Sequence, residues 1–382
     1  MFFKNTEFSK HVRILSIETI PVLVPIRPEF QIRGSLGYHL ESPFVLLKVH
    51  TDEGLTGLGE VSCTPVWSGE DAVTATHVIA DFLGPALEGE DPRDIERLTA
   101  KMRRTVAGHP FTKSGIEIAL WDILGKAGGL PVYRLLGGAV RERVPIKMSV
   151  SGAEPQRAAE LAMWAMNKGL KALKVKVGIE PEGDLVRVKA VRQAIGPSVR
   201  MGVDANGGWS VRVAIRTIRR MADECNIYFA EQPVAPLDVQ WLADVRRNIT
   251  VPVMADESCY TLQDAMAITR AAAADILSVY VGKGGGIGPA RKMAAVAEAA
   301  GLTCTVGSNL EMGIASAAMA HLATATPGIG AEEFPCDILG PLAYEHDLLT
   351  EPLDFRDGSI KAPDGPGLGV TLDEKMLARY RA

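Results

Sequence analysis

Short apolar runs alternate with amphipathic segments through the middle of the chain. The runs at about 144–150, 172–177, 200–204, 227–231, 252–256, 276–281 and 302–306 predict β-strands, and a weaker run at 329–334 predicts an eighth. Helical periodicity lies between them, for example over 154–169 and 288–301. Because a β-α-β connection is right-handed, such alternation makes the strands parallel. The pattern predicts an α/β fold, a (β/α)7β TIM-like barrel over residues 141–354.

The first third of the chain has a different pattern. Apolar residues at 12–26 and 43–61 predict strands, the second stretch turning at Asp52, Glu53 and Gly54. Residues 29–42 between them are polar and contain glycine, so we expect a loop. Helical periodicity follows at about 70–87, 92–106 and 112–128. Strands followed by helices predict a separate α+β domain over residues 1–140, which the turn-rich tail at about 355–382 is expected to complete.

Composition narrows the class of protein. The chain has 382 residues, 47% of them hydrophobic and 23% charged, with a net charge of −5. This charge gives no reason to expect nucleic acid or an anionic membrane as partner. Five scattered cysteines without CxxC spacing indicate reduced thiols. Residues 1–14 lack the apolar core of a signal peptide, and no run approaches the ~20 apolar residues of a membrane span, so we expect a cytoplasmic protein.

Charged residues stand at the ends of four consecutive predicted strands. Lys174 and Lys176 are two positions apart, so both point to one side of their strand. An edge strand with a solvated lysine face is the alternative. Inside a parallel barrel both faces are covered, and inward lysines need partners. Asp204, Glu231 and Asp256 end the next three strands and supply such partners at the same mouth.

Three carboxylates at one strand level repel one another unless a cation neutralises them. Taken singly, each acid could instead cap a following helix. Oxygen ligands favour a hard ion, so we expect one Mg²⁺ or Mn²⁺ per subunit at Asp204, Glu231 and Asp256. Asn206 and Glu257 flank these acids and are expected to orient ligands or lysines through hydrogen bonds.

Lys283 is predicted to end the next strand, across the barrel from Lys174 and Lys176. The three glycines that follow it fit neither GxGxxG nor a P-loop. We expect them to let substrate approach the backbone beside the lysine. A divalent ion flanked by lysines suits removal of the proton α to a bound carboxylate through an ene-diolate, a strategy known from enolase-type enzymes.

The chain resembles the muconate lactonizing enzymes (muconate cycloisomerases) of the enolase superfamily, in the mandelate racemase/muconate lactonizing enzyme family. The resemblance is carried by residues 111–138, the K-x-K motif, the three acids, MADES at 254–258, the lysine before the glycines, and PGLGVTLDE at 366–374. It implies an N-terminal capping domain over the barrel, metal ligation by the three acids, and acid/base roles for Lys176 and Lys283. It also implies a homo-oligomer. Glu311 matches the family's acid after the seventh strand, unless it is a helix-start carboxylate.

Specificity is expected to come from the capping-domain loops at about 30–41 and 64–70. Arg33, Tyr38, His39 and Trp67 lie there. An arginine there can pair a distal carboxylate, and a tryptophan can cover an apolar part of the substrate. No histidine falls at the sixth or seventh strand end, which argues against the mandelate-racemase type. Residues 332–341 lack the Asp-x-Asp pattern of dipeptide epimerases.

The leading hypothesis is therefore a muconate-cycloisomerase-like isomerase acting on a small-molecule carboxylate. The alternative is a racemase or epimerase of N-acyl amino acids, dipeptides or proline derivatives on the same lysines; a dehydratase or an o-succinylbenzoate synthase would share the site. Two alternatives belong to other functional classes. A Schiff-base aldolase would leave the three acids unexplained. A non-catalytic metal-binding protein would bind metal but would catalyse no isotope exchange in any carboxylate ligand.

Overall fold

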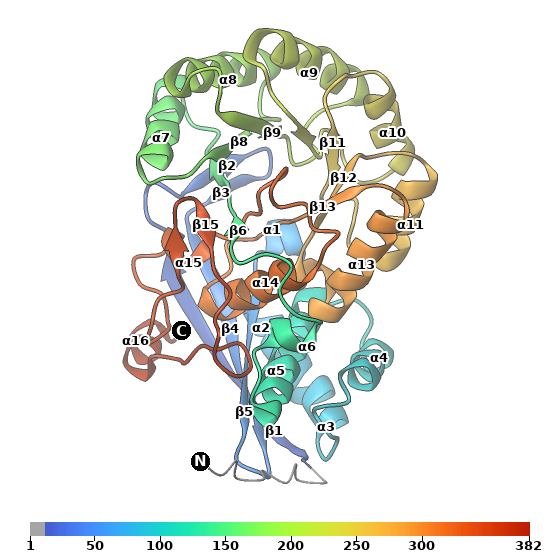
Figure 1. Cartoon of the computed structure of the whole chain (residues 1–382), viewed down its shortest axis with the longest axis vertical. Coiled ribbons are helices and arrows are strands. Elements are labelled where there is room, and N and C mark those ends of the chain that lie inside the picture. The colour runs from blue at the N-terminus through green and yellow to red at the C-terminus, as the bar shows by residue number, and fades with distance from the viewer. Residues whose placement is uncertain (1–11) are drawn as a thin grey trace.

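The computed structural model describes residues 12–382, and the N-terminal residues behind the signal-peptide expectation lie mostly outside that range. The chain begins with an antiparallel sheet of β1 (Ile14–Pro25), β4 (Glu41–Thr51) and β5 (Thr56–Ser62), in the order β1-β4-β5. Side chains alternate between its two faces. Val45, Leu47 and Val49 face a helical layer, while Leu46 faces the core that the sheet shares with the rest of the molecule. Figure 1 shows β1, β4 and β5 in blue in the lower half of the view.

The helical layer confirms the predicted helices, with shifted ends. The first run is α2 (Ala72–Val78), η1 (Ile79–Leu83) and α3 (Gly84–Leu87), followed by α4 (Ile95–Thr105) and α5 (Pro110–Gly128). Helix α5 lies directly on β5 because two strand residues lack side chains. A Cβ on Gly57 would lie 2.2 Å from the carbonyl oxygen of Ala119, and one on Gly59 would lie 2.0 Å from that of Gly115.

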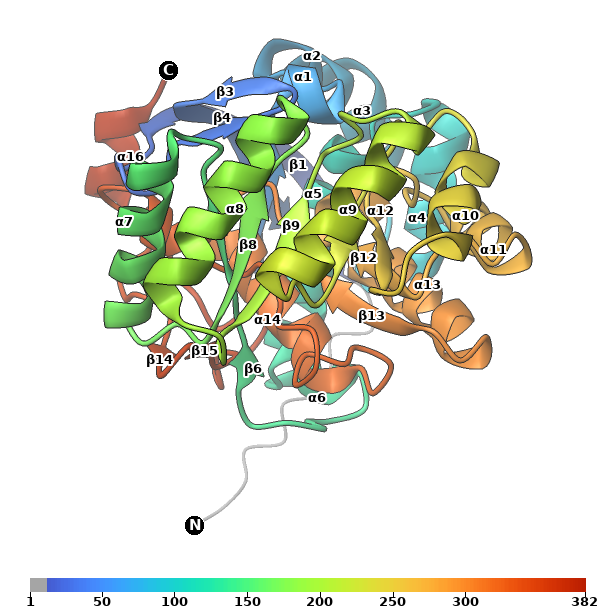
Figure 2. The same ribbon diagram turned by 90° about the horizontal axis from the view of Figure 1, so that it is seen from above.

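The barrel sheet runs in the order β13-β12-β11-β10-β9-β8-β7 with parallel pairing. Its strands are β7 (Met148–Val150), β8 (Ala172–Lys176), β9 (Arg200–Asp204), β10 (Ala230–Glu231), β11 (Val253–Ala255), β12 (Ile276–Val279) and β13 (Thr303–Val306). The helices between and after them are α7 (Pro155–Asn167), α8 (Pro181–Ile195), α9 (Val211–Cys225), α10 (Val239–Arg247), α11 (Leu262–Arg270), α12 (Val281–Gly284), α13 (Ile287–Ala299) and α14 (Gly313–Ala325). Figure 2 shows α7 to α11 arranged outside the strands. The predicted barrel fold is confirmed.

The predicted eighth strand at 329–334 is wrong, although the segment still closes the barrel. The Cys304 amide donates to the Gly328 carbonyl at 3.1 Å on one side. On the other side the Cys336 amide donates to Pro145 and the Lys147 amide to Cys336, both at 2.9 Å. Gly330 and Pro335 interrupt the run of residues that could form a regular ladder.

The segment predicted as a loop at 29–42 contains a hairpin, so that prediction is also wrong. Strand β2 (Ile32–Gly34) pairs with β3 (Gly37–His39), and Gly37 takes a φ of 109° in the turn. The Ser35 hydroxyl donates to the Ala205 carbonyl at 2.9 Å. The hairpin is therefore attached to the loop after β9, and together with α1 (Pro65–Ser68) it borders the barrel mouth.

The C-terminal tail contacts both parts of the molecule. Its elements, with the remaining short ones, are α6 (Val132–Leu135), β6 (Val144–Pro145), α15 (Gly340–Ala343), β14 (Phe355–Arg356), β15 (Ser359–Ile360) and α16 (Glu374–Tyr380). Glu374 forms an ion pair with Lys48 of β4 at 2.7 Å, whereas β15 pairs with β6 beside the barrel. The domain limits at 140 and 355 stay predictions.

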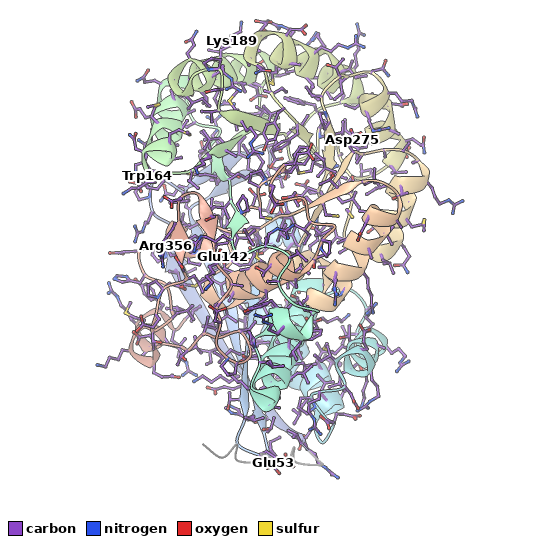
Figure 3. All side chains as sticks on the ribbon, in the orientation of Figure 1. Glu53, Glu142, Trp164, Lys189, Asp275 and Arg356 are labelled. Atoms are coloured by element: carbon purple, nitrogen blue, oxygen red, sulfur yellow. The ribbon has the colours of Figure 1, made fainter. Side chains whose placement is uncertain are left out.

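The polar surface is ordinary. Glu53 lies at the β4–β5 turn and Lys189 on the outside of α8 (Figure 3). The five cysteines are buried and free, as expected for reduced thiols. Within residues 12–382, no helix has both the length and the apolar character needed to cross a membrane.

Two barrel helices obtain their N-terminal caps from the first part of the chain. Neither α13 nor α14 has a capping side chain of its own. Glu117 of α5 accepts the Ile287 and Gly288 amides, both at 2.8 Å. Glu60 of β5 accepts the Met312 amide at 2.7 Å and the Ala315 amide at 3.0 Å. These carboxylates satisfy amides that a helix leaves unpaired at its start, and they join the two parts of the fold.

Glu60 should make stability depend on pH. Burial raises the pKa of Glu60 to about 8; the nearby Glu311 and Asp347 add to this rise, and burial outweighs the lowering by the two amide donors from Ala315 and Met312. The folded protein thus holds this proton more tightly than the unfolded chain, whose Glu pKa is about 4.3. The stabilisation of the folded state by protonated Glu60 is therefore complete below the pKa of Glu in the unfolded chain. It is lost as pH rises through about 8.

We therefore expect the free energy of unfolding to fall between about pH 5 and pH 9. Glu60→Gln should reduce that fall by on the order of 1–3 kcal/mol, because the amide does not titrate. Urea unfolding across this pH range measures the effect. Glu351→Gln, at an exposed position, is the matched control. An unchanged pH dependence in Glu60→Gln would contradict the assignment.

Candidate active site

Two lysines of β8 lie at the centre of the barrel mouth. Lys174 Nζ is 2.8 Å from Glu231 Oε1 and 3.3 Å from both Asp204 Oδ2 and Asp337 Oδ2. Burial alone lowers the pKa of Lys174, but Asp337, Glu231 and Asp204 outweigh it and raise the pKa well above its usual value. Lys174 is therefore a fixed ammonium.

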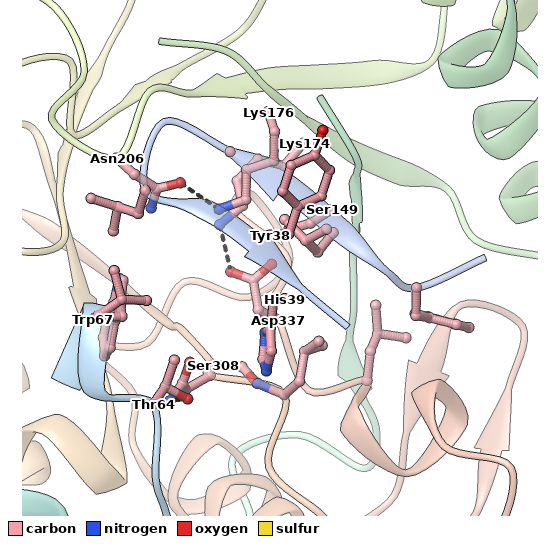
Figure 4. A pocket seen from close by; sticks show the side chains of 18 of the residues that line it. Tyr38, His39, Thr64, Trp67, Ser149, Lys174, Lys176, Asn206, Ser308 and Asp337 are labelled. Atoms are coloured by element: carbon pink, nitrogen blue, oxygen red, sulfur yellow. Dashed lines mark hydrogen bonds and ion pairs between the residues drawn. The ribbon is translucent and has the colours of Figure 1, made fainter. Parts of the chain in front are cut away.

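Lys176 lies nearer the opening and begins a chain of hydrogen bonds. Its Nζ donates to Asp204 Oδ2 at 2.7 Å. It also donates to Asn206 Oδ1 at 2.8 Å (Figure 4). Asn206 Nδ2 donates to Glu257 Oε1 at 2.8 Å, and the Trp67 indole donates to the same oxygen at 3.1 Å. The structure thus places Asn206 and Glu257 where the sequence predicted. They connect Lys176 to a loop of the first domain.

The three predicted metal ligands come from adjacent strands. Glu231 pairs in register with Asp204, and Asp256 immediately follows β11. Lys176 and Lys174 lower the pKa of Asp204 against the opposing effect of burial. The pKa of Glu231 is raised, mainly by burial and also by the nearby acids, although Lys174 opposes the rise.

The residues fit a hard divalent cation. Within residues 12–382 no three acidic, histidine or cysteine side chains form a ready-made metal cage, since Lys174 lies among the acids. However, Glu231 Oε2 is buried without a hydrogen-bond partner, which is costly for a carboxylate. An all-carboxylate donor set with an unpaired buried oxygen suits Mg²⁺ or Mn²⁺. The metal ligation itself stays a prediction.

A cavity opens above these charges. The cavity is lined by Phe30, Ile32, Gly34, Leu36, Gly37, Tyr38, His39, Thr64, Val66, Trp67, Met148, Ser149, Lys174, Lys176, Asn206, Tyr280, Ser308, Asn309, Leu310, Asp337 and Leu339. The hairpin and the loop around α1 supply mainly apolar and aromatic groups, whereas the barrel strand ends supply the charged ones (Figure 4). One end of a bound molecule therefore meets charge and the other meets apolar side chains.

Three of the four predicted specificity residues line this cavity, namely Tyr38, His39 and Trp67. Burial, followed by the charge of Lys176, lowers the pKa of His39 to about 4, so its imidazole is neutral at pH 7. The predicted pairing of Arg33 with a distal carboxylate of the substrate stays a prediction. The Arg33 guanidinium lies over the Tyr38 ring and 3.9 Å from Glu154, outside the cavity lining.

Lys283 does not lie where the sequence predicted. Strand β12 ends at Val279, and Lys283 lies in the short helix α12. Its fully buried Nζ donates to Asp256 Oδ1 at 2.5 Å, to the Asp256 carbonyl at 2.6 Å and to the Ser278 carbonyl at 3.0 Å. It does not line the cavity. Gly284 and Gly286 make room for other side chains, since a Cβ on Gly284 would lie 2.8 Å from the Met293 methyl carbon and one on Gly286 would lie 2.3 Å from the Glu117 carboxyl carbon. None of the three glycines lines the cavity.

Glu311 is also outside the cavity lining. Its carboxylate accepts the Ser308 hydroxyl at 2.5 Å and the Asn309 amide at 3.0 Å, so it shapes the loop whose residues Ser308 and Asn309 do line the cavity. Burial raises its pKa. Its position does not support the predicted catalytic role. Glu311 does not accept the amides at the start of α14, since Glu60 accepts those of Met312 and Ala315 and Asp347 accepts that of Gly313.

Sequence reasoning missed Asp337, Lys147 and Tyr280. Asp337 lies 2.9 Å from the buried Lys147 and contacts Lys174, and it comes from the irregular closing segment that carries no strand pattern. Tyr280 is the first residue after β12, as Asp256 is after β11. A comparison of the residues at the same strand-end position, whatever their type, would have found Tyr280; a search for charged residues alone does not.

The geometry matches a known family across most of the chain. Residues 15–137 match the mandelate racemase/muconate lactonizing enzyme N-terminal domain, and residues 156–376 match the enolase C-terminal domain-like family. The chain belongs to the mandelate racemase/muconate lactonizing enzyme family of the enolase superfamily. Like its relatives in this family, it is an isomerase.

Family members with different reactions are similarly close. The N-succinyl-L-Arg/Lys racemase of Bacillus cereus is 34% identical over 96% of this chain and 97% of its own length. The muconate lactonizing enzyme of Pseudomonas fluorescens, solved with muconolactone, superposes with a TM-score of 0.92 at 32% identity, covering 97% and 99%. A dipeptide epimerase of Enterococcus faecalis, solved with Mg and L-Leu-L-Tyr, gives 0.88 at 30%, covering 94% and 99%. Identity alone does not select among these reactions.

The carboxylate cluster yields a prediction about metal binding. Glu231→Gln removes a charge from the acid with the unpaired oxygen, so we expect Mn²⁺ affinity to fall by more than about tenfold. Isothermal titration calorimetry measures it. Asp244→Asn, a change at a partly exposed position on α10, should bind as the unmodified protein does. Equal affinity in Glu231→Gln would remove this residue from the ligand set.

Proposed function

We propose that this isomerase moves the proton α to the carboxylate of a small molecule, in the manner of a muconate cycloisomerase, with Lys176 as the group that handles the proton. The observation that carries the proposal is the position of Lys176. Its Nζ lies in the cavity wall, bonded to Asp204 and Asn206, directly beside the acids proposed to hold Mg²⁺ or Mn²⁺. A positioned amine beside a charge-stabilising site is what enolisation of a carboxylate requires.

The chain's own residues divide the work as follows. Lys176 takes the α-proton, and Asn206 holds the lysine in place through its amide oxygen. Lys174 supplies fixed positive charge next to Asp204, Glu231 and Asp337. When bound, the divalent ion supplies further positive charge that stabilises the carboxylate-derived enolate. Trp67 and the β2–β3 hairpin exclude water from this side of the mouth.

The cavity favours one class of carboxylate. Its only cationic side chains among the described residues are Lys174 and Lys176, and its far wall is formed by groups such as Leu36, Val66 and the neutral His39. We therefore propose a substrate whose α-carboxylate meets the charged barrel end and whose remainder is apolar or ring-shaped. The expected homo-oligomer and the cytoplasmic location stay predictions.

Solvent deuterium incorporation, followed by NMR, tests the proposal. The panel contains cis,cis-muconate, N-succinyl-L-arginine, L-Leu-L-Tyr and proline betaine, each with Mg²⁺ or with a chelator. We expect metal-dependent exchange or isomerisation of at least one member. Lys176→Met should reduce the rate by at least about 10²-fold, because it removes the proton acceptor.

Lys171 is exposed and immediately precedes β8, the strand that carries Lys176. Lys171→Met is therefore the matched control and should leave the rate unchanged. Exchange at the full rate in Lys176→Met would refute the proposed role. Exchange that persists in the chelated sample would refute the metal dependence.

A further inference from the structure

Tyr280 occupies the strand-end position across the barrel from Lys176. Strands β9, β10 and β11 lie between β8, which carries Lys176, and β12, which Tyr280 follows. In a closed barrel of eight units, that separation places two residues on opposite sides of the mouth. Both Tyr280 and Lys176 line the cavity. An aromatic hydroxyl therefore stands where the sequence predicted a second lysine.

The surroundings of Tyr280 fix its orientation. Its hydroxyl donates to Asp256 Oδ2 at 2.9 Å. Its ring stacks on that of Trp67, with centroids 5.2 Å apart and planes 19° apart. A stacked ring with a hydroxyl already committed to a buried carboxylate has little freedom to rotate.

Lys283 lies behind this ring. Its Nζ is 4.3 Å from the centroid of Tyr280 and 5.5 Å from that of Tyr260, within the range of cation–π contacts. Its hydrogen bonds go to Asp256 and to the Ser278 carbonyl. Since Tyr280 lines the cavity and Lys283 does not, the ring separates the ammonium from any bound molecule.

We propose that Tyr280 closes the face of the cavity opposite Lys176, that Lys283 is a positioning residue for Asp256, and that the enzyme therefore moves its proton at one face only. This inference rests on the proposed function. Lys176 takes the α-proton as the C–H bond breaks, and the electron pair passes into the carboxylate-conjugated system. When the same ammonium returns the proton to the same face of that carbon, the C–H bond re-forms with retained configuration and only exchange results. In the isomerisation the electron pair instead breaks the C–O bond at the β-carbon and frees a carboxylate of the substrate; the reverse reaction forms that C–O bond, and Lys176 delivers the proton to the same face. The chain therefore follows a one-sided path and not two-base racemisation.

Amine labelling of the protein with Mg²⁺ tests the placement without any substrate. Lysines are acetylated with limiting acetic anhydride and their rates followed by peptide mass spectrometry, with the exposed Lys171 as reference. We expect Lys283 to react at least about tenfold more slowly than Lys176, since its labelling requires local opening. Tyr280→Ala should remove much of this protection. Labelling of Lys283 as fast as that of Lys176 would overturn the proposal.

Stereochemistry tests the consequence, using the chiral members of the same panel in D2O. The unmodified enzyme should incorporate deuterium with retained configuration, whereas Tyr280→Lys should add inversion because it installs an amine on the second face. Inversion by the unmodified enzyme at the rate of its exchange would overturn the one-sided path. Absence of exchange with every compound would count against the proposed function on this panel, while the labelling result still decides where Lys283 lies.

Discussion

The structure depends on the balance of charge buried at the barrel mouth. Asp204, Glu231, Asp256 and Asp337 are removed from water together, and an unpaired buried carboxylate is too costly to persist. Lys174 contacts three of them, and Lys283 contacts Asp256. The parallel sheet brings these groups together because its strands all end at one side. One oxygen of Glu231 and one of Asp337 stay buried without a hydrogen-bond partner, and the one on Glu231 supports the prediction of a divalent cation there.

The first domain is part of this site and not a separate module. Glu60 caps the helix that follows the loop carrying Glu311, and Glu117 caps the helix that follows α12, which carries Lys283. Trp67 meets Glu257 at the end of the hydrogen-bond chain that begins at Lys176. Carboxylates of the first domain hold the N-termini of two barrel helices. The way the first domain packs therefore also determines where the segments before these helices lie. Mouth geometry and domain packing are therefore determined together.

The barrel and the charged residues at the ends of β8, β9, β10 and β11 could be predicted from the sequence, because each of these residues directly ends an apolar run. Lys283 was misplaced because the run from Ile276 continues through Val281, where a strand and a one-turn helix are equally apolar. The hairpin at 32–39 was missed because its strands are too short to show alternation. Asp337 was missed because its segment closes the barrel without a regular ladder. The position of the Arg33 side chain depends on Glu154, which is distant in sequence, and on Tyr38, its cross-strand partner in the unpredicted β2–β3 hairpin.

The central claim is that the acids of β9, β10 and β11 form a cation site now neutralised by Lys174. Anomalous diffraction from a crystal soaked in Mn²⁺ tests it most directly. We predict a manganese peak at Asp204, Glu231 and Asp256, with Lys174 Nζ moved from its 2.8 Å contact with Glu231. A structure without that peak at saturating Mn²⁺, with Lys174 still on Glu231, would contradict the account.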